Sequence, residues 1–203
     1  DFGNVATALT TEGKNITVGG SRLTSFNVTE RDTVKGILFR PEQLTFATNM
    51  KNLSRIVIKG SAYQSDIVTG GLDLSSLWRL RYVDLTGTKA ISVTLPENSN
   101  IDTLYLPSTL RKLELKNLKM LAQENFEMKS YKNLTSLTII GCEKIDSRLI
   151  FNKCFEADAK LESINISGID WIDVTTDQLI YLLGVPSLSI SGKITMIEGD
   201  AGL

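Results

Sequence analysis

The segment Leu80-Arg-Tyr-Val83-Asp-Leu85 contains the apolar pattern that decides the fold of this chain. The pattern is Leu-x-x-(Leu/Ile/Val)-x-(Leu/Ile). It recurs at Leu53-Ile56-Ile58, Ile101-Leu104-Leu106, Leu110-Leu113-Leu115, Leu134-Leu137-Ile139 and Leu161-Ile164-Ile166, with a weaker copy at Leu188 and Ile190. One strand with alternating apolar residues cannot bury its face alone, whereas stacked copies bury a continuous core. The repetition therefore predicts a solenoid of stacked coils.

The spacing of the repeats is regular except at one place. Ile56 and Val83 are 27 residues apart, and Val83 and Leu104 are 21 apart, but only 9 residues separate Leu104 from Leu113. Two interpretations remain open. Residues 83–85 and 104–106 can form front strands while residues 93–95 and 113–115 form a second series on the back. Alternatively, residues 113–115 form a front strand after a tight turn.

The two ends of the chain differ from its middle. Three β-branched segments within residues 1–45 predict a β-rich N-terminal cap or an irregular first coil: residues 15–18, 23–28 and 34–39. Residues 46–194 are the predicted solenoid, and residues 195–203 are a predicted tail or linker. The chain begins with Asp1 rather than Met, which indicates a processed product or a piece of a longer protein.

Two helices are expected on the back of the later coils. Thr175 and Gln178 have the spacing of a capping box, and Gly184 and Pro186 end that helix. Its apolar face is expected at Leu179, Ile180, Leu182 and Leu183. Asp146 is expected to cap another helix through Leu149, Ile150, Cys154 and Phe155. Trp171 lies among Asp170, Asp173 and Asp177, and we expect it to pack over the edge of the core.

Composition excludes several kinds of function. The 203 residues have a net charge of -1 without a long run of one sign, which argues against nucleic acid or anionic membrane as a partner. No apolar stretch is long enough to span a membrane. The chain has no histidine, which excludes Ser-His-Asp and Cys-His catalysis and every His-ligated metal site. Free, buried thiols are the favoured interpretation of Cys142 and Cys154, with a disulfide as the alternative.

The segments at Leu80–Thr88, Val93–Glu97 and Leu104–Leu110 resemble irregular bacterial members of the leucine-rich repeat superfamily. Such repeats occur in proteins of gut Bacteroidetes and of phages that infect them. The resemblance implies an irregular α/β solenoid with a parallel front sheet and a few helices on the back. The family's asparagine after each strand is missing, because its positions hold other residues here: Ser61, Thr88, Thr109, Leu118, Cys142 and Ile169. We therefore expect the coil geometry to vary between turns.

The resemblance implies a non-enzymatic structural or protein-binding module, without a cofactor, in a phage virion or tail assembly. Its partners would be protein subunits or a host-surface receptor. The alternative is a secreted or surface-anchored bacterial adhesion protein. An enzyme that uses carboxylates alone, such as a glycosidase, is the third hypothesis, but no acidic pair can be assigned the required separation of roughly 5 to 9.5 Å.

Candidate binding residues lie between the apolar anchors, where side chains would face outward on the front sheet. They are Arg55, Lys59, Tyr82, Asp84, Tyr105 and Asn165. Tyr82 and Tyr105 are expected to lie diagonally on neighbouring strands, and aromatic side chains with a polar group are common at interfaces. The alternative is a solvated sheet face with ordinary cross-strand pairs.

Overall fold

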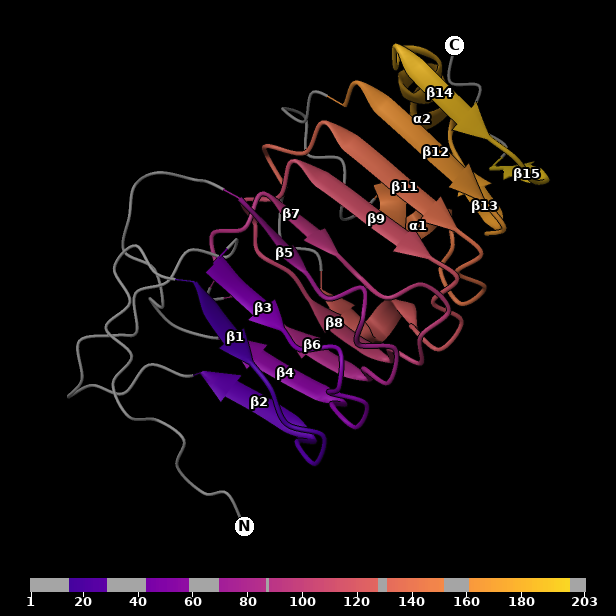
Figure 1. The fold of residues 1–203 in the computed structure, drawn as a ribbon. Helices are drawn as coiled ribbons and strands as arrows, with labels where there is room; N and C mark the ends of the chain where they lie inside the picture. The colour runs from indigo at the N-terminus through magenta and orange to yellow at the C-terminus, as the bar shows by residue number, and fades with distance from the viewer. Residues whose placement is uncertain are drawn as a thin grey trace, which may run out of the picture.

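A computed structural model describes residues 15–28, 43–58, 70–86, 88–127, 131–151 and 161–197. In this structure the chain forms a parallel β-solenoid with few helices (Figure 1). Successive turns stack along one axis, and every pairing between the named strands is parallel. The predicted repeat solenoid is therefore confirmed at the level of its architecture.

The strands form two main sheets with a shared core. The five-stranded sheet contains β2 (Ser25–Val28), β4 (Arg55–Ile58), β6 (Tyr82–Asp84), β8 (Thr103–Tyr105) and β10 (Phe126–Glu127). The six-stranded sheet contains β5 (Gly71–Asp73), β7 (Ser92–Thr94), β9 (Lys112–Lys116), β11 (Ser136–Ile140), β12 (Ser163–Ser167) and β14 (Ser187–Ile190). Through the middle of the described chain, successive strands belong to alternate sheets (Figure 1).

The two-series interpretation of the middle segment is confirmed, because β6 and β8 share one sheet while β7 and β9 share the other. The expectation that the later strands continue the front sheet is wrong. Strand β11 pairs with β9, and β12 pairs with β11, so both belong to the six-stranded sheet. Both sheets bury one face in the same core and so need the same apolar alternation, which is why the local pattern does not distinguish them.

The register of the strands places the apolar anchors one above another in the core. Ile56 pairs with Val83 and Val83 with Leu104, while Leu113 pairs with Leu137 and Leu137 with Ile164. All of these side chains are buried. Each fully buried aliphatic side chain contributes about 1.5–3 kcal/mol relative to an exposed one. The repeated pattern is thus the source of a continuous core through the turns.

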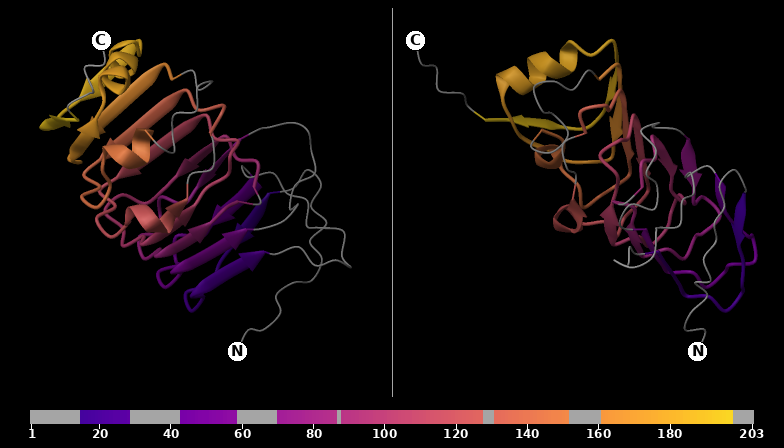
Figure 2. Two further views of the ribbon diagram at one scale, coloured as in Figure 1. Left: turned by 180° about the vertical axis from the view of Figure 1, so that it is seen from behind. Right: turned by 90° about the vertical axis from the view of Figure 1, so that its left-hand side faces the viewer.

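Helices and short strands replace the strands of the five-stranded sheet in the later turns. The 3-10 helix η2 (Gln123–Asn125) directly precedes β10, and the elements after β10 are α1 (Ser147–Leu149), α2 (Thr176–Leu183) and the parallel pair β13 (Trp171–Val174) and β15 (Ile194–Met196). In Figure 1, α1 lies behind the six-stranded sheet. The view from behind shows it in front of that sheet (Figure 2, left). The expected helices are therefore present among the described residues.

The predicted capping box of α2 is confirmed. The Thr175 hydroxyl accepts a hydrogen bond from the Gln178 backbone N–H at 3.2 Å, and the Gln178 side chain accepts one from the Thr175 N–H at 2.9 Å. Gly184 is the C-cap. The apolar face is narrower than expected, because Leu182 is buried but Ile180 and Leu183 are 62% and 69% exposed. Leu179 is partly buried against the core, so the contact is made by Leu179 and Leu182.

Asp146 caps α1 as predicted and accepts a hydrogen bond from the Arg148 backbone N–H at 2.9 Å. The expected continuation to Cys154 and Phe155 lies outside the described residues. Trp171 is buried, as expected, and its indole N–H donates to the Ser191 carbonyl at 3.1 Å. Cys142 is a free, buried thiol.

The described part of the N-terminal region follows the stacking of the later turns. Strand β1 (Ile16–Val18) pairs with β3 (Leu44–Phe46), and β2 pairs with β4. The strand expected at residues 34–39 lies outside the described residues, so the N-terminal cap stays a prediction. Of the predicted tail, residues 195 and 196 belong to β15.

Candidate binding surface on the five-stranded sheet

Three side chains on the outer face of the five-stranded sheet form a continuous stack, here called the Arg55–Tyr105 strip. Its members are Arg55 on β4, Tyr82 on β6 and Tyr105 on β8. The Arg55 guanidinium carbon lies 3.7 Å from the centre of the Tyr82 ring. The ring centres of Tyr82 and Tyr105 are 6.0 Å apart with an edge-to-face geometry. The predicted diagonal arrangement of the two tyrosines is confirmed.

The register of the sheet produces this stack. Arg55 pairs directly with Tyr82, which places the cation over the ring. Tyr82 pairs with Thr103 and Asp84 with Tyr105, so the two tyrosines are diagonal neighbours. At an exposed site a cation–π contact contributes about 0.5–1 kcal/mol, and an aromatic pair contributes about 0.5–1.5 kcal/mol. These contacts favour the stacked conformation of the strip before a partner binds.

An ion pair lies beside the strip at the start of β8. Arg81 Nη2 lies 2.8 Å from Asp102 Oδ2, and Arg81 Nε also donates to this oxygen at 3.1 Å. The other carboxylate oxygen of Asp102 accepts from the Thr103 hydroxyl at 3.0 Å. The pair is largely exposed, and such pairs contribute about 0–1 kcal/mol. Its main consequence is that the charge of Arg81 is balanced locally.

Asp84 does not join the strip, although its position between anchors predicted an outward, exposed side chain. It is 1% exposed. Its carboxylate accepts hydrogen bonds from the Thr86 backbone N–H at 3.2 Å and from the Thr86 hydroxyl at 2.8 Å. The carboxylate therefore stabilises the turn after β6. The expectation of an exposed Asp84 is wrong, because alternation predicts which face a side chain takes and not what covers that face.

The other two candidate residues are not brought together with the strip. Asn165 is exposed, but it belongs to β12 of the six-stranded sheet, where it pairs with Thr138 and Ser189. The prediction of one surface shared by Asn165 and the tyrosines is wrong for this reason. Lys59 lies outside the described residues.

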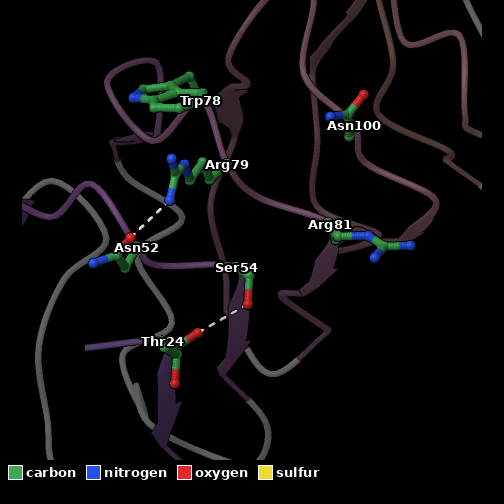
Figure 3. Close-up of a pocket in the computed structure, with 7 residues that line it drawn as sticks. All are labelled: Thr24, Asn52, Ser54, Trp78, Arg79, Arg81 and Asn100. Atoms are coloured by element: carbon green, nitrogen blue, oxygen red, sulfur yellow. Dashed lines mark hydrogen bonds between the residues drawn. The ribbon is translucent and has the colours of Figure 1, made fainter. Parts of the chain in front are cut away.

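A shallow hollow, here called the Trp78 hollow, lies next to the strip, at the edge where the chain enters the strands of the five-stranded sheet (Figure 3). Its volume is about 470 Å³. Its lining side chains come from four successive turns and are polar or aromatic: Thr24, Asn52, Ser54, Trp78, Arg79, Arg81 and Asn100. The pattern of strand anchors does not predict this hollow, because its residues lie outside the positions between the anchors. The available signal was a tryptophan beside two arginines at non-anchor positions, Trp78-Arg79-Leu80-Arg81.

Hydrogen bonds between turns hold the Trp78 hollow. Arg79 Nη1 donates to the Asn52 side-chain oxygen at 2.7 Å, and the Asn52 amide donates to the Ser21 carbonyl at 2.8 Å. The Ser54 hydroxyl donates to the Thr24 carbonyl at 3.1 Å. Arg79 also lies over the Trp78 ring, with 4.6 Å from the guanidinium carbon to the ring centre. In Figure 3, Arg79 lies between Trp78 and Asn52.

The perturbed ionisable groups of the described chain lie outside both features. Burial raises the pKa of the Cys142 thiol. Burial also acts to raise the pKa of Asp146, but the Arg148 guanidinium and two backbone N–H groups outweigh it and hold that pKa below its usual value. The same contact raises the pKa of Arg148. Burial raises the pKa of Tyr181.

Within the described ranges, no cluster of three or more His, Cys, Asp or Glu side chains is arranged to hold a metal ion. No helix in the described part of the chain is long and apolar enough to cross a membrane. No family model matches the chain, and neither a curated protein nor a solved structure matches it. The candidate surface is therefore argued from its own geometry.

Proposed function

We propose that this protein is a non-enzymatic binding module that recognises another protein through the Arg55–Tyr105 strip. The observation that carries the proposal is the stack of Arg55, Tyr82 and Tyr105 across three neighbouring strands. Tyr and Arg are enriched among the residues that dominate binding energy at protein interfaces. Here the stack fixes them on a rigid sheet, which lowers the entropy that binding must cost.

We also propose that the solenoid is of the leucine-rich repeat type. Two features support it: the repeated Leu-x-x-Leu-x-Leu phrase, and paired residues 20 to 30 positions apart, from Ser92 with Lys112 to Ser25 with Arg55. Thr109, at an expected asparagine position, donates to the Ala90 carbonyl at 2.7 Å.

The proposed setting is a phage virion or tail assembly, with neighbouring subunits or a host-surface receptor as partners. Repeat solenoids suit this role because they present a long rigid face that does not need a catalytic cleft. The second candidate is a secreted or surface-anchored bacterial adhesion protein. The exposed Trp78 in the Trp78 hollow favours this alternative, because it offers a second recognition surface.

The absence of histidine from the sequence supports a function without catalysis. So does the state of the acids near the strip. Asp84 is engaged with Thr86, and Asp102 is engaged with Arg81 and Thr103. Carboxylate catalysis would need one acid to hold a proton near neutral pH and a second to face it across a groove.

The test is the mass of the chain in solution, measured by light scattering over a concentration series. We expect an assembly component to form an oligomer whose amount rises with concentration. The double variant Tyr82→Ala/Tyr105→Ala is expected to lower the association constant at least tenfold. Tyr181→Ala is the matched control, because Tyr181 is an exposed tyrosine on α2, away from the strip.

A second arm covers a partner other than a second copy. Immobilised wild-type protein is screened against purified virion subunits and cell-surface proteins, and every binder is retested on the double variant. Loss of binding in the double variant with retention in Tyr181→Ala supports the proposal. A monomer without any binder, or an oligomer and binders that the double variant retains, contradicts it.

A further inference from the structure

The Trp78 hollow combines an exposed aromatic ring with polar groups from several turns, and the Arg55–Tyr105 strip does not account for it. Thr24, Ser54 and Arg81 lie immediately before β2, β4 and β6. Backbone hydrogen bonds from Ser54 to Thr24 (3.0 Å) and from Arg81 to Ser54 (2.9 Å) fix them side by side. Asn52 and Arg79 lie two residues earlier in adjacent turns. The surface is thus repeated and preformed, which favours a ligand of repeating units.

Trp78 provides a flat apolar platform. Its side chain is 54% exposed, whereas the other tryptophan, Trp171, is 1% exposed. It lies on the turn between β5 and β6, and the Arg79 guanidinium lies over one face of its ring. An indole face with a polar rim matches a ring that is apolar on one face and bears hydroxyls at its edge. A pyranose sugar has this shape.

The polar groups of the hollow suit hydroxyls that both donate and accept. The Asn52 amide uses one N–H for the Ser21 carbonyl and its oxygen for Arg79, which leaves a second N–H. The Ser54 hydroxyl donates to Thr24 and keeps its acceptor capacity. Asn100 is exposed and contributes both functions. An open hollow of about 470 Å³ lies within the range of ligand sites, roughly 300–1,000 Å³.

The charge of the hollow indicates whether a neutral or a charged sugar fits it better. Arg81 is balanced by Asp102. Within the described part of the chain, the hydrogen-bond partner of the Arg79 guanidinium is the neutral Asn52 amide, and no carboxylate pairs with it. One positive charge is therefore left in the hollow. A guanidinium pairs with a carboxylate through two parallel hydrogen bonds, which is a geometry that a neutral sugar does not supply.

We propose that the Trp78 hollow binds a carboxylate-bearing sugar unit of an acidic polysaccharide. The sugar ring lies on Trp78, its carboxylate pairs with Arg79, and its hydroxyls bond to Asn52, Ser54 and Asn100. The site is separate from the protein-binding strip. Because the hollow is open, we expect a dissociation constant for a short oligosaccharide of about 0.1–1 mM, which many units along one polymer would strengthen by multivalency.

The experiment is a calorimetric titration of the whole chain with tri-galacturonate, and with its methyl ester as the matched neutral ligand. We expect saturable binding of the acid and at least tenfold weaker binding of the ester. Arg79→Gln is expected to weaken binding of the acid at least tenfold and to leave the ester unchanged. Trp78→Ala is expected to weaken both ligands, and Tyr181→Ala is expected to weaken neither.

Four outcomes would overturn the proposal. The first three are no binding of tri-galacturonate at 10 mM, equal binding of the acid and its ester, and unchanged binding of the acid by Arg79→Gln. The fourth is equal competition by dextran sulfate in wild type and Arg79→Gln, which would indicate simple ion exchange. Circular dichroism of each variant separates loss of the fold from loss of the site. The strip variant Tyr82→Ala/Tyr105→Ala is expected to bind tri-galacturonate as wild type does. Loss of protein association in the strip variant and loss of sugar binding in Arg79→Gln therefore test the two proposals separately.

Discussion

Asn117 and Gly141 occupy the same position at the ends of the adjacent strands β9 and β11, and the Asn117 side-chain oxygen fills the space that a Cβ on Gly141 would take. Both residues have left-handed backbones, with φ of 55° and 62°. The Asn117 N–H donates to the Ile140 carbonyl at 2.7 Å, and the Gly141 N–H to the Ser167 carbonyl at 2.9 Å. These turns therefore link consecutive coils by backbone hydrogen bonds.

Gly141→Ala is expected to destabilise the protein by about 2–3 kcal/mol. A left-handed backbone costs an L-residue about 1–2 kcal/mol, and the added methyl group must also displace the Asn117 oxygen. Gly19→Ala is the control, because a Cβ there meets Ala47 at an ordinary 3.5 Å. Urea unfolding followed by circular dichroism measures both. Equal midpoints for the two variants would contradict the expected strain.

Two buried serines should differ in their response to alanine: one substitution should destabilise the protein and the other should not. Ser147 Oγ donates to the Ile172 carbonyl at 2.7 Å and accepts from the Ile172 N–H at 2.9 Å. Ser147→Ala should therefore cost about 1–3 kcal/mol. Ser99 Oγ is buried without a hydrogen-bond partner among the described residues, so Ser99→Ala should be neutral or stabilise by up to about 1 kcal/mol. Unfolding free energies that change in the same direction for both would refute this assignment.

The capping box of α2 gives a local prediction. Thr175→Ala removes the acceptor for the Gln178 N–H and should destabilise the helix by about 1 kcal/mol, whereas Thr175→Ser should retain most of the cap. The measurement is hydrogen exchange of the amides in Thr176–Leu183. Exchange in Thr175→Ala should be about fivefold faster than in wild type. Unchanged protection would show that packing of Leu182 alone holds the helix.

Asp146 gives a pH dependence. Its pKa is held below the ordinary value of about 3.9, so the charged form favours the folded state. This contribution is fully present above about pH 4 and is lost as pH falls through the lower, folded-state pKa. Asp146→Asn keeps a cap but has no charge to lose. Wild type should therefore lose more unfolding free energy than the variant between pH 5 and pH 2, and parallel curves would contradict the coupling to Arg148.

Part of the candidate surface could be predicted from sequence because it depends on local spacing. Tyr82 precedes the anchor Val83 and Tyr105 follows the anchor Leu104, so any parallel register that stacks Val83 on Leu104 also makes the tyrosines diagonal neighbours. Asp84 also lies between two anchors, but its burial could not be predicted. Alternation predicts the face of the strand on which a side chain lies, and it does not predict which residues cover that face. Trp78 and Arg79 lie in a corner turn, where no strand period applies.

The repeated core follows from the sequence alone, because every buried anchor must follow the period of the strand and every turn must pack against its neighbour. The sequence also determined the cap of α2, which depends on groups three residues apart. The tertiary structure decided which strands share a sheet, since both sheets bury the same pattern in one core. It also brought Asn52 and Arg79, 27 residues apart in the chain, within hydrogen-bond distance across two turns. Contacts between turns depend on the length and path of the corners, and the period of the strands does not encode either.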